Sequence, residues 1–68
     1  MDIRDWLRNA LADGPADTRT VSQAARKEGY RRKELKEARH ELGVQLLREK
    51  DNLTGETTYF WALPEGEL

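Results

Sequence analysis

The sequence predicts an α+β domain that is mainly α-helical, with three helices followed by a two-stranded β-hairpin. Apolar residues recur at helical spacing in three successive segments, and the hydrophobic period changes to two after Gly43. A chain of 68 residues has room for one small domain. We therefore assign residues 1–64 to this domain and residues 65–68 to a frayed tail.

The first helix is predicted to follow Asp2, whose carboxylate is a good N-cap. Asp13-Gly14-Pro15 then ends it, because glycine tolerates a left-handed cap and proline cannot continue a helix. Trp6 lies in the middle of the apolar stripe, which predicts core packing rather than an exposed stacking platform. The stripe, spaced i, i+3, i+4, i+7 and i+8, consists of Ile3, Trp6, Leu7, Ala10 and Leu11.

The second helix is predicted to begin between Thr18 and Thr20. Thr20 and Gln23 have the spacing of a capping box, and Asp17 is a competing cap. Gly29 ends this helix, and only a very short turn separates it from the next one, which predicts helix-turn-helix geometry. Its narrow apolar edge is formed by Val21, Ala24 and Ala25.

The third helix is predicted over residues 31–42, with Leu35, Ala38 and Leu42 on its buried line. The charges around its remaining surface are sorted by sign rather than mixed. One flank and the outer side are basic, with Arg32, Lys33, Lys36, Arg39 and His40. The other flank is acidic, with Glu34, Glu37 and Glu41, and is available to pair with basic residues elsewhere on the surface.

Alternating residues 44–49 and the β-forming run 57–63 predict two strands of a hairpin, joined by a loop of about six residues. Three helices with a tight second turn and a following hairpin describe a winged helix-turn-helix domain, in which the hairpin is called the wing. In that architecture the third helix lies in the major groove of DNA, with the wing beside it.

The net charge of −1 conceals a strong segregation of charge along the chain. Residues 19–48 carry nine basic and four acidic side chains, a balance of +5, whereas the remainder carries −6. A domain with one basic face can bind a polyanion although its overall charge is slightly negative. An uneven but purely solvated surface is the alternative explanation.

Composition argues against several other classes of protein. The chain has no cysteine and a single histidine, His40, so it lacks disulfides and the ligands of a typical zinc site. We find no phosphate-binding loop, nucleophile–base pair or carboxylate–histidine cluster, and therefore expect neither an enzyme nor a cofactor. No apolar run is long enough to span a membrane, and no signal pattern opens the chain, which makes the cytoplasm the expected location.

Several short motifs resemble the small winged-helix domain at the C-terminus of AAA-type replication ATPases and primase-helicases of phages, plasmids and integrative elements. The most specific are the Asp13-Gly14-Pro15 turn, the Leu42-Gly43-Val44 helix stop and the closing Trp61-Ala62-Leu63-Pro64. The resemblance covers residues 3–64 and implies the winged-helix fold more strongly than it implies a function. The other matching residues are Trp6-Leu7, Leu11-Ala12, Ala25, Gly29, Leu35 and Ala38.

The chain departs from that family in two places. The family often begins the third helix with Ser or Thr and has Thr three residues later, whereas this chain has Arg31 and Glu34. The N-cap is therefore expected to be weak. The wing tip, residues 50–56, has one basic and two acidic side chains and is expected to contact phosphate poorly. These 68 residues contain no ATPase segment, so the chain is either a domain of a longer protein or a free-standing relative.

These observations predict a DNA-binding module that serves DNA replication or a mobile genetic element. The expected partners are double-stranded DNA and, secondarily, replication proteins, with no membrane and no small-molecule substrate. The alternative is a protein-docking domain that uses the acidic flank, Leu53 at the wing tip, and either Tyr59 or Phe60. The residues predicted to contact DNA are Arg26, Lys27, Arg31, Arg32, Lys33, Lys36, Arg39 and His40.

Overall fold

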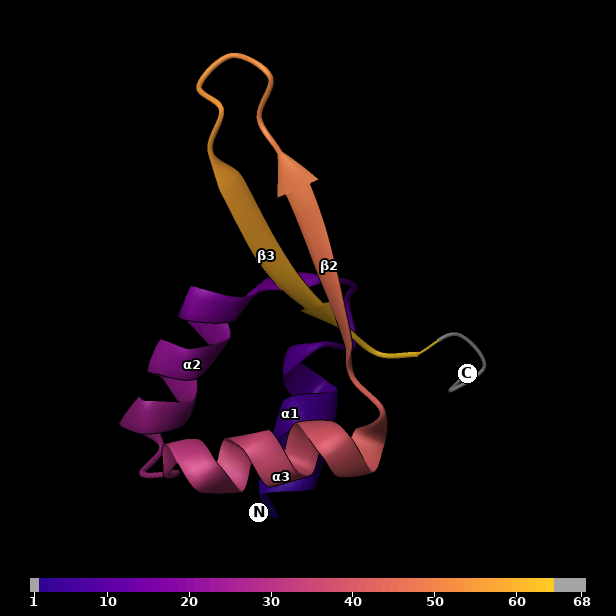
Figure 1. Ribbon diagram of the computed structural model, residues 1–68. Coiled ribbons are helices and arrows are strands. Elements are labelled where there is room, and N and C mark those ends of the chain that lie inside the picture. Colours follow the sequence, from indigo (N-terminus) through magenta and orange to yellow (C-terminus); the bar gives the residue numbers. More distant parts are fainter. Residues whose placement is uncertain (1, 65–68) are drawn as a thin grey trace.

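The computed structural model describes residues 2–64, which form three helices, a short strand between the first two, and a C-terminal hairpin (Figure 1). This order confirms the predicted α+β architecture and is consistent with a winged helix-turn-helix. The predicted tail, residues 65–68, lies outside the described residues. The elements are α1 (Ile3–Ala10), β1 (Ala16–Asp17), α2 (Thr18–Lys27), α3 (Arg32–Leu42), β2 (Gln45–Lys50) and β3 (Thr57–Ala62).

Helix α1 begins as predicted, with Asp2 as its N-cap. Asp2 Oδ1 accepts a hydrogen bond from the backbone N–H of Arg4 at 2.8 Å, and the Arg4 guanidinium Nη2 lies 2.9 Å from Asp2 Oδ2. The side-chain hydrogen bond from Arg4, followed by the backbone one, lowers the pKa of Asp2 to about 2. The charged carboxylate is thus part of the start of the helix.

Helix α2 begins at Thr18, within the predicted range, and its cap is Asp17, one of the two caps that the sequence offered. The alternative, a capping box at Thr20, is wrong. Asp17 Oδ1 accepts the backbone N–H of Arg19 at 2.7 Å, and the helix already begins at Thr18. The physical reason lies in the sheet, because Asp17 pairs with Phe60 and is thereby held in an extended conformation immediately before the helix. Thr20 consequently lies inside the first turn of the helix, so it is not the N-cap residue.

The sheet has three antiparallel strands in the order β1-β3-β2, so β3 is central. In the hairpin, Leu46 lies opposite Trp61 and Arg48 lies opposite Tyr59. Strand β1 was not predicted, since two residues are too few to show an alternating pattern. Its pairing with Phe60 and Trp61 attaches the base of the hairpin to the helices.

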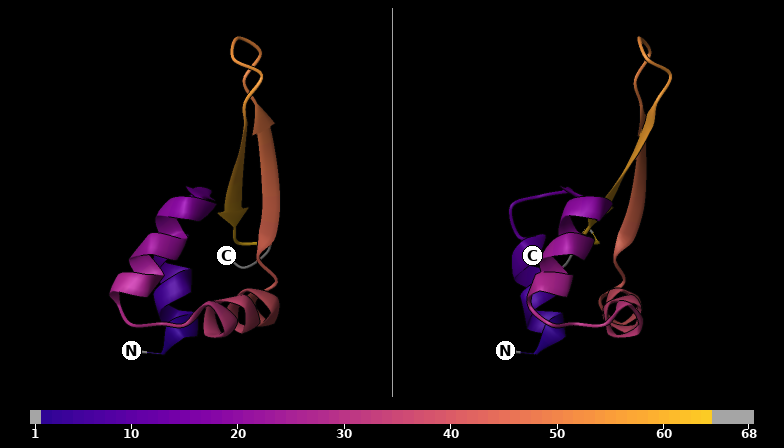
Figure 2. Two further views of the ribbon diagram at one scale, coloured as in Figure 1. Left: turned by 60° about the vertical axis from the view of Figure 1, so that its left-hand side comes forward. Right: turned by 90° about the vertical axis from the view of Figure 1, so that its left-hand side faces the viewer.

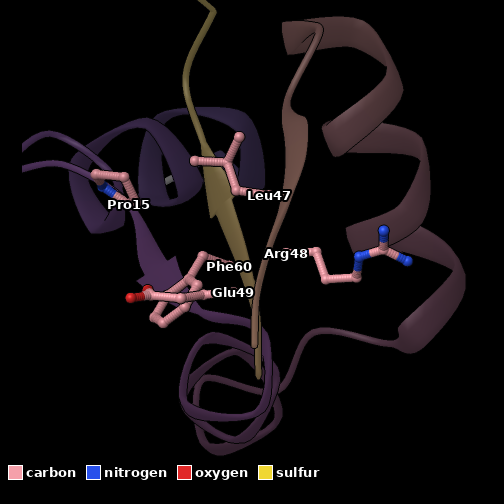
Figure 3. Close-up of a pocket in the computed structure, with 5 residues that line it drawn as sticks. All are labelled: Pro15, Leu47, Arg48, Glu49 and Phe60. Atoms are coloured by element: carbon pink, nitrogen blue, oxygen red, sulfur yellow. The ribbon is translucent and has the colours of Figure 1, made fainter. Parts of the chain in front are cut away.

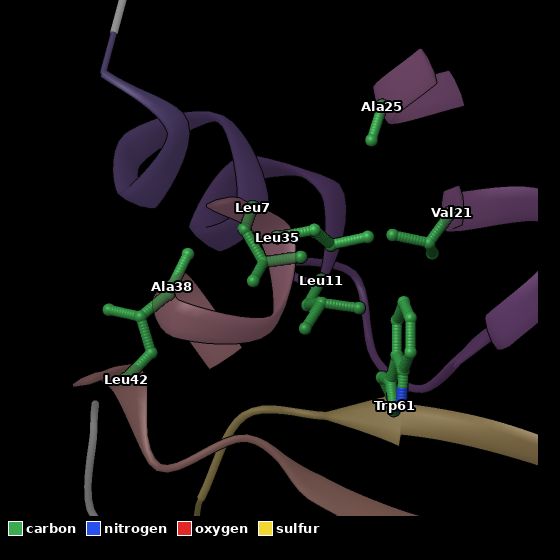
Figure 4. Close-up of a cluster of buried hydrophobic side chains, with 8 residues drawn as sticks. All are labelled: Leu7, Leu11, Val21, Ala25, Leu35, Ala38, Leu42 and Trp61. Atoms are coloured by element: carbon green, nitrogen blue, oxygen red, sulfur yellow. The ribbon is translucent and has the colours of Figure 1, made fainter. Parts of the chain in front are cut away.

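The core lies where all three helices meet the base of β3 (Figure 4). Leu7 and Leu11 are its most completely buried large side chains, and Trp61 closes it from the sheet. Trp6 packs against this cluster but remains partly exposed, so the prediction of Trp6 as core packing is confirmed only at the edge of the core. The buried cluster consists of Leu7, Leu11, Val21, Ala25, Leu35, Ala38, Leu42 and Trp61.

The hairpin projects away from the helices and makes the molecule elongated, with extents of 40 × 28 × 18 Å (Figure 2). Every residue of β2 is exposed, and burial in β3 begins only near its end, at Phe60. Side-chain packing against the core therefore holds the base of the wing, while its outer part has backbone pairing and the side-chain hydrogen bonds of its turn. No helix within residues 2–64 has the length and apolarity needed to cross a membrane.

Candidate nucleic-acid interface

The turn between α2 and α3 is short because Gly29 adopts a left-handed conformation, with φ of +89°. The backbone N–H of Tyr30 then donates to the carbonyl of Ala25 at 3.0 Å, which closes the end of α2. The Tyr30 ring packs on Trp6 of α1, with 5.6 Å between ring centroids. These contacts fix the start of α3 against the rest of the domain.

At the start of α3 the Arg31 side chain makes no capping hydrogen bond, as the predicted weak N-cap implies, but Glu34 caps the helix from within its first turn. Glu34 Oε1 accepts the backbone N–H of Arg31 at 3.0 Å, which is the glutamate half of a capping box. A glutamate at the third helical position was the available signal for this cap. Glu34 therefore stabilises the helix start, and Arg31 and Arg32 remain exposed beside it.

The outer side of α3 brings together three of the residues predicted to contact DNA. Lys33, Lys36 and His40 line an open pocket of about 460 Å³, which they share with Glu37 and Glu41. The predicted buried line of this helix is confirmed, so this surface faces away from the core. Glu41 also pairs with Arg4 of α1 at 3.4 Å, as expected for the acidic flank.

Arg39 differs from the other predicted contact residues because it is half-buried. Its guanidinium carbon lies 4.5 Å from the centroid of the Trp61 ring, a cation–π arrangement that joins α3 to β3. Its Nε is buried without a hydrogen-bond partner. Arg39 thus packs at the junction of helix and sheet, whereas the other predicted contact residues are exposed.

A second group of basic residues lies in a pocket between α2, the start of α3 and Trp61. This pocket of about 320 Å³ brings together Arg26 and Arg32, both predicted contacts, with Arg19, which was not. The spacing of Arg19 and Arg26, seven residues apart and therefore on one face of α2, was the signal available in the sequence. The pocket is completed by Thr18, Ser22 and Gln23. Lys27 and Arg31 are exposed on the same helix-turn-helix unit.

The wing presents two chemically different faces. Arg48 and Lys50 share the face of Trp61, because they lie on alternate positions of β2 and opposite Tyr59 and Thr57. Figure 3 shows Arg48 pointing to the opposite side of the hairpin from Glu49 and Phe60. The face that carries Trp61 is therefore basic.

The other face of the wing contains an open groove of about 330 Å³, lined by Leu47 and Phe60 with Pro15 at its base (Figure 3). At the wing tip, Asp51 Oδ1 accepts the backbone N–H of Leu53 at 2.8 Å, so this acidic side chain forms part of the turn. Leu53 itself is 96% exposed. The sequence predicted that either Tyr59 or Phe60 is exposed on the hairpin; Tyr59 is the exposed one, and Phe60 is partly buried.

The described part of the chain contains no group of three His, Cys, Asp or Glu residues that could hold a metal ion. What the surface offers is positive charge and hydrogen-bond donors on α2, α3 and one face of the wing. Comparisons of the chain with protein-family models, with curated proteins and with solved structures find no significant match.

Proposed function

We propose that the chain is a DNA-binding module whose helix α3 enters the major groove of duplex DNA. The observation that carries this proposal is the exposure of Arg32, Lys33, Lys36 and His40 on a helix whose opposite side is held in the core. The major groove is about 12 Å wide and admits one α-helix. The proposal gives the chain a binding role and no catalytic one.

In this proposal some basic residues contact bases, some contact the DNA backbone, and one supports the helix. Arg32, Lys33 and Lys36 contact bases and phosphates, because arginine and lysine donate to guanine and also hold phosphate oxygens. Arg26, Lys27, Arg31 and His40 flank them and contact the DNA backbone. Arg39 supports the helix through its contact with Trp61. A single domain of this size binds weakly, at about micromolar or worse, and a linked domain or second copy supplies further affinity by avidity.

The resemblance of the Asp13-Gly14-Pro15, Leu42-Gly43-Val44 and Trp61-Ala62-Leu63-Pro64 motifs to the C-terminal domains of replication ATPases supports a narrower proposal. In this narrower proposal the module acts in the cytoplasm. It serves either DNA replication or a mobile genetic element such as a phage.

Charge reversal on the outer side of α3 tests the DNA-binding proposal. Lys33→Glu combined with Lys36→Glu should abolish binding to a random-sequence duplex at low salt, because both exposed cations become repulsive. Arg8→Glu on α1 is the control, since Arg8 is exposed and lies outside α2, α3 and the wing. NMR titration of the unaltered chain should shift residues 26–40, and added salt should reverse the shifts.

If the double charge reversal leaves the affinity for DNA unchanged while circular dichroism shows a folded chain, α3 is not the reading helix.

One observation favours a second candidate, a protein-docking role for the wing. The wing exposes several large apolar side chains: Leu46 at 62%, Leu47 at 40%, Leu53 at 96% and Tyr59 at 44%. Leu46 and Tyr59 lie on the face of Trp61, Leu47 lies on the other face, and Leu53 lies at the tip. Large apolar side chains exposed together on one face can form the patch that a protein partner covers. Absence of duplex-induced shifts at any salt concentration, together with capture of a purified replication protein that shifts the wing resonances, would favour this role over DNA binding.

A further inference from the structure

The pocket between α2, α3 and Trp61 has a composition suited to an anion. Three of its lining residues are the arginines Arg19, Arg26 and Arg32, and within residues 2–64 no acidic residue lines it. Thr18 and Ser22 add hydroxyl groups, and Gln23 adds a side-chain amide that can donate. Its lining therefore consists of hydrogen-bond donors around the edge of an indole ring.

The fold brings these arginines together from two helices. Arg19 and Arg26 lie two turns apart on one face of α2, and Arg32 is the first residue of α3. The tight turn at Gly29 carries the start of α3 back beside that face. Trp61, held by pairing of β3 with both other strands, forms the remaining wall.

The three guanidinium groups are not neutralised within the described part of the chain. The ion pairs there join Arg4 to Asp2 and Glu41, and Arg8 to Asp5, so all of them involve α1. Each of these arginines has an acidic residue two positions away in the sequence. Asp17 accepts the backbone N–H of Arg19 and Glu34 accepts that of Arg31, so both carboxylates cap helices. Among the described residues, Glu28 forms no ion pair with Arg26. Three like charges around one pocket repel one another until an anion enters.

We propose that this pocket binds one phosphate group of the DNA backbone, an inference that rests on the proposed function. Arginine suits this ligand because its planar guanidinium can donate two parallel hydrogen bonds to a phosphate. A backbone phosphate held here fixes the register of α3 in the groove and carries no sequence information itself. Arg19 thereby joins the DNA-contacting residues.

Arg39 has a positioning role in this site. Its guanidinium covers the Trp61 ring, and that stack joins α3 to the wall of the pocket.

A pair of charge-matched double variants tests the pocket. Arg19→Gln with Arg26→Gln removes two pocket arginines, and Arg4→Gln with Arg8→Gln removes two arginines from α1. The unaltered chain and both variants are titrated with a random-sequence duplex at several salt concentrations, and separately with inorganic phosphate at constant ionic strength. NMR follows the arginine Nε–H signals, and the backbone spectrum of each variant confirms that it is folded.

We expect the pocket variant to lose about tenfold or more in affinity for duplex, as hydrogen bonds to charged groups imply, and its slope of log affinity against log salt to become shallower by about 0.9. The α1 variant should change the affinity less than twofold. Inorganic phosphate should shift the Nε–H signals of Arg19, Arg26 and Arg32 in the unaltered chain, and the pocket variant should lose the response of Arg32.

The remaining outcomes separate the two proposals. If the chain binds duplex and the pocket variant behaves like the α1 variant, the pocket inference is overturned and the DNA-binding proposal stands. If duplex does not bind but inorganic phosphate shifts these arginines, the pocket is a phosphate site and its assignment to DNA is overturned. If neither ligand produces a response, both proposals are overturned.

Discussion

Leu7 and Leu53 carry the same side chain and occupy opposite environments, which makes them a matched pair for a stability measurement. Leu7 is fully buried among the three helices, and Leu53 is 96% exposed at the wing tip. Leu7→Ala should lower the free energy of unfolding by about 2–5 kcal/mol, comparable with the whole stability of such a domain. Leu53→Ala should change it by about 0.5 kcal/mol or less. Urea denaturation followed by circular dichroism measures both.

Equal losses for the two leucine variants would contradict the described core. Trp6→Ala should lower the free energy of unfolding by an amount between those of the two leucine variants, since the Trp6 ring packs at the edge of the core and remains partly exposed. The sequence alone predicted Trp6 as a core residue, whose loss would cost as much as that of Leu7. The structure assigns the larger effect to Leu7.

Asp2 gives the start of α1 a dependence on pH. Its pKa is about 2 in the folded chain, below the ordinary value of 3.8, so its contribution to stability is present above about pH 4. That contribution is lost as pH falls through about 2. The difference in stability between the unaltered chain and Asp2→Asn should therefore be constant above pH 4 and shrink towards zero near pH 2. Urea denaturation at a series of pH values measures it, and a difference that stays constant down to pH 2 would contradict the role of the ionised carboxylate.

Arg39 shows what residue patterns leave out. The sequence correctly indicated that Arg39 lies on the basic flank of its helix, close to the line of Leu35. Its packing on Trp61 depends on where β3 meets α3, and a helical pattern contains no information about that meeting. By contrast, the buried line of α3 followed directly from spacing, because one helix face must cover the core.

At the scale of secondary-structure elements, Asp17 and Thr20 both have side chains suited to cap α2, and in the structure Asp17 is the cap. Asp17→Ala should destabilise the domain by about 1 kcal/mol, because it removes the acceptor for the Arg19 backbone N–H. Thr20→Ala should be nearly neutral, since Thr20 lies within the first turn and is exposed. Thermal unfolding should separate the two variants by roughly 4–8 °C. A larger loss for Thr20→Ala would restore the capping box that the sequence suggested.

The helices and the hairpin were predictable because their signals are local. Helical spacing, glycine stops, the alternation over residues 44–49 and the β-forming run 57–63 all lie within short windows. Strand β1 was not predictable in this way, because its two residues become a strand only through pairing with Phe60 and Trp61. The selection of Asp17 rather than Thr20 as the cap of α2 depends on the same pairing. The short strand and the position of the cap therefore have one cause.

At the scale of the whole molecule, charge segregation determines how binding responds to salt. The excess of positive charge in residues 19–48 was readable from the sequence. The structure distributes it over α2, α3 and the face of the wing that carries Trp61. If about five phosphates are neutralised, log affinity for duplex should fall with log salt at a slope near −4.5. Fluorescence anisotropy over a series of salt concentrations measures it, and a slope near zero would contradict electrostatic binding.

The sequence could not predict which basic residues share a site. Lys33, Lys36 and His40 gather because one helix presents them together. Arg19 and Arg32 meet because the turn at Gly29 places two helices side by side, a tertiary relation. The candidate site was thus predictable within one helix and not between helices.

Strand β2 lies at the edge of the sheet with all its residues exposed, and no strand formed by residues 2–64 pairs with its outer side. Such an edge is a template on which another polypeptide can add itself as a strand, and repetition of that addition leads to aggregation. Arg48, Glu49 and Lys50 oppose it, because charged side chains discourage one edge from stacking against another. We therefore expect that neutralising these three consecutive charges would favour strand addition at β2.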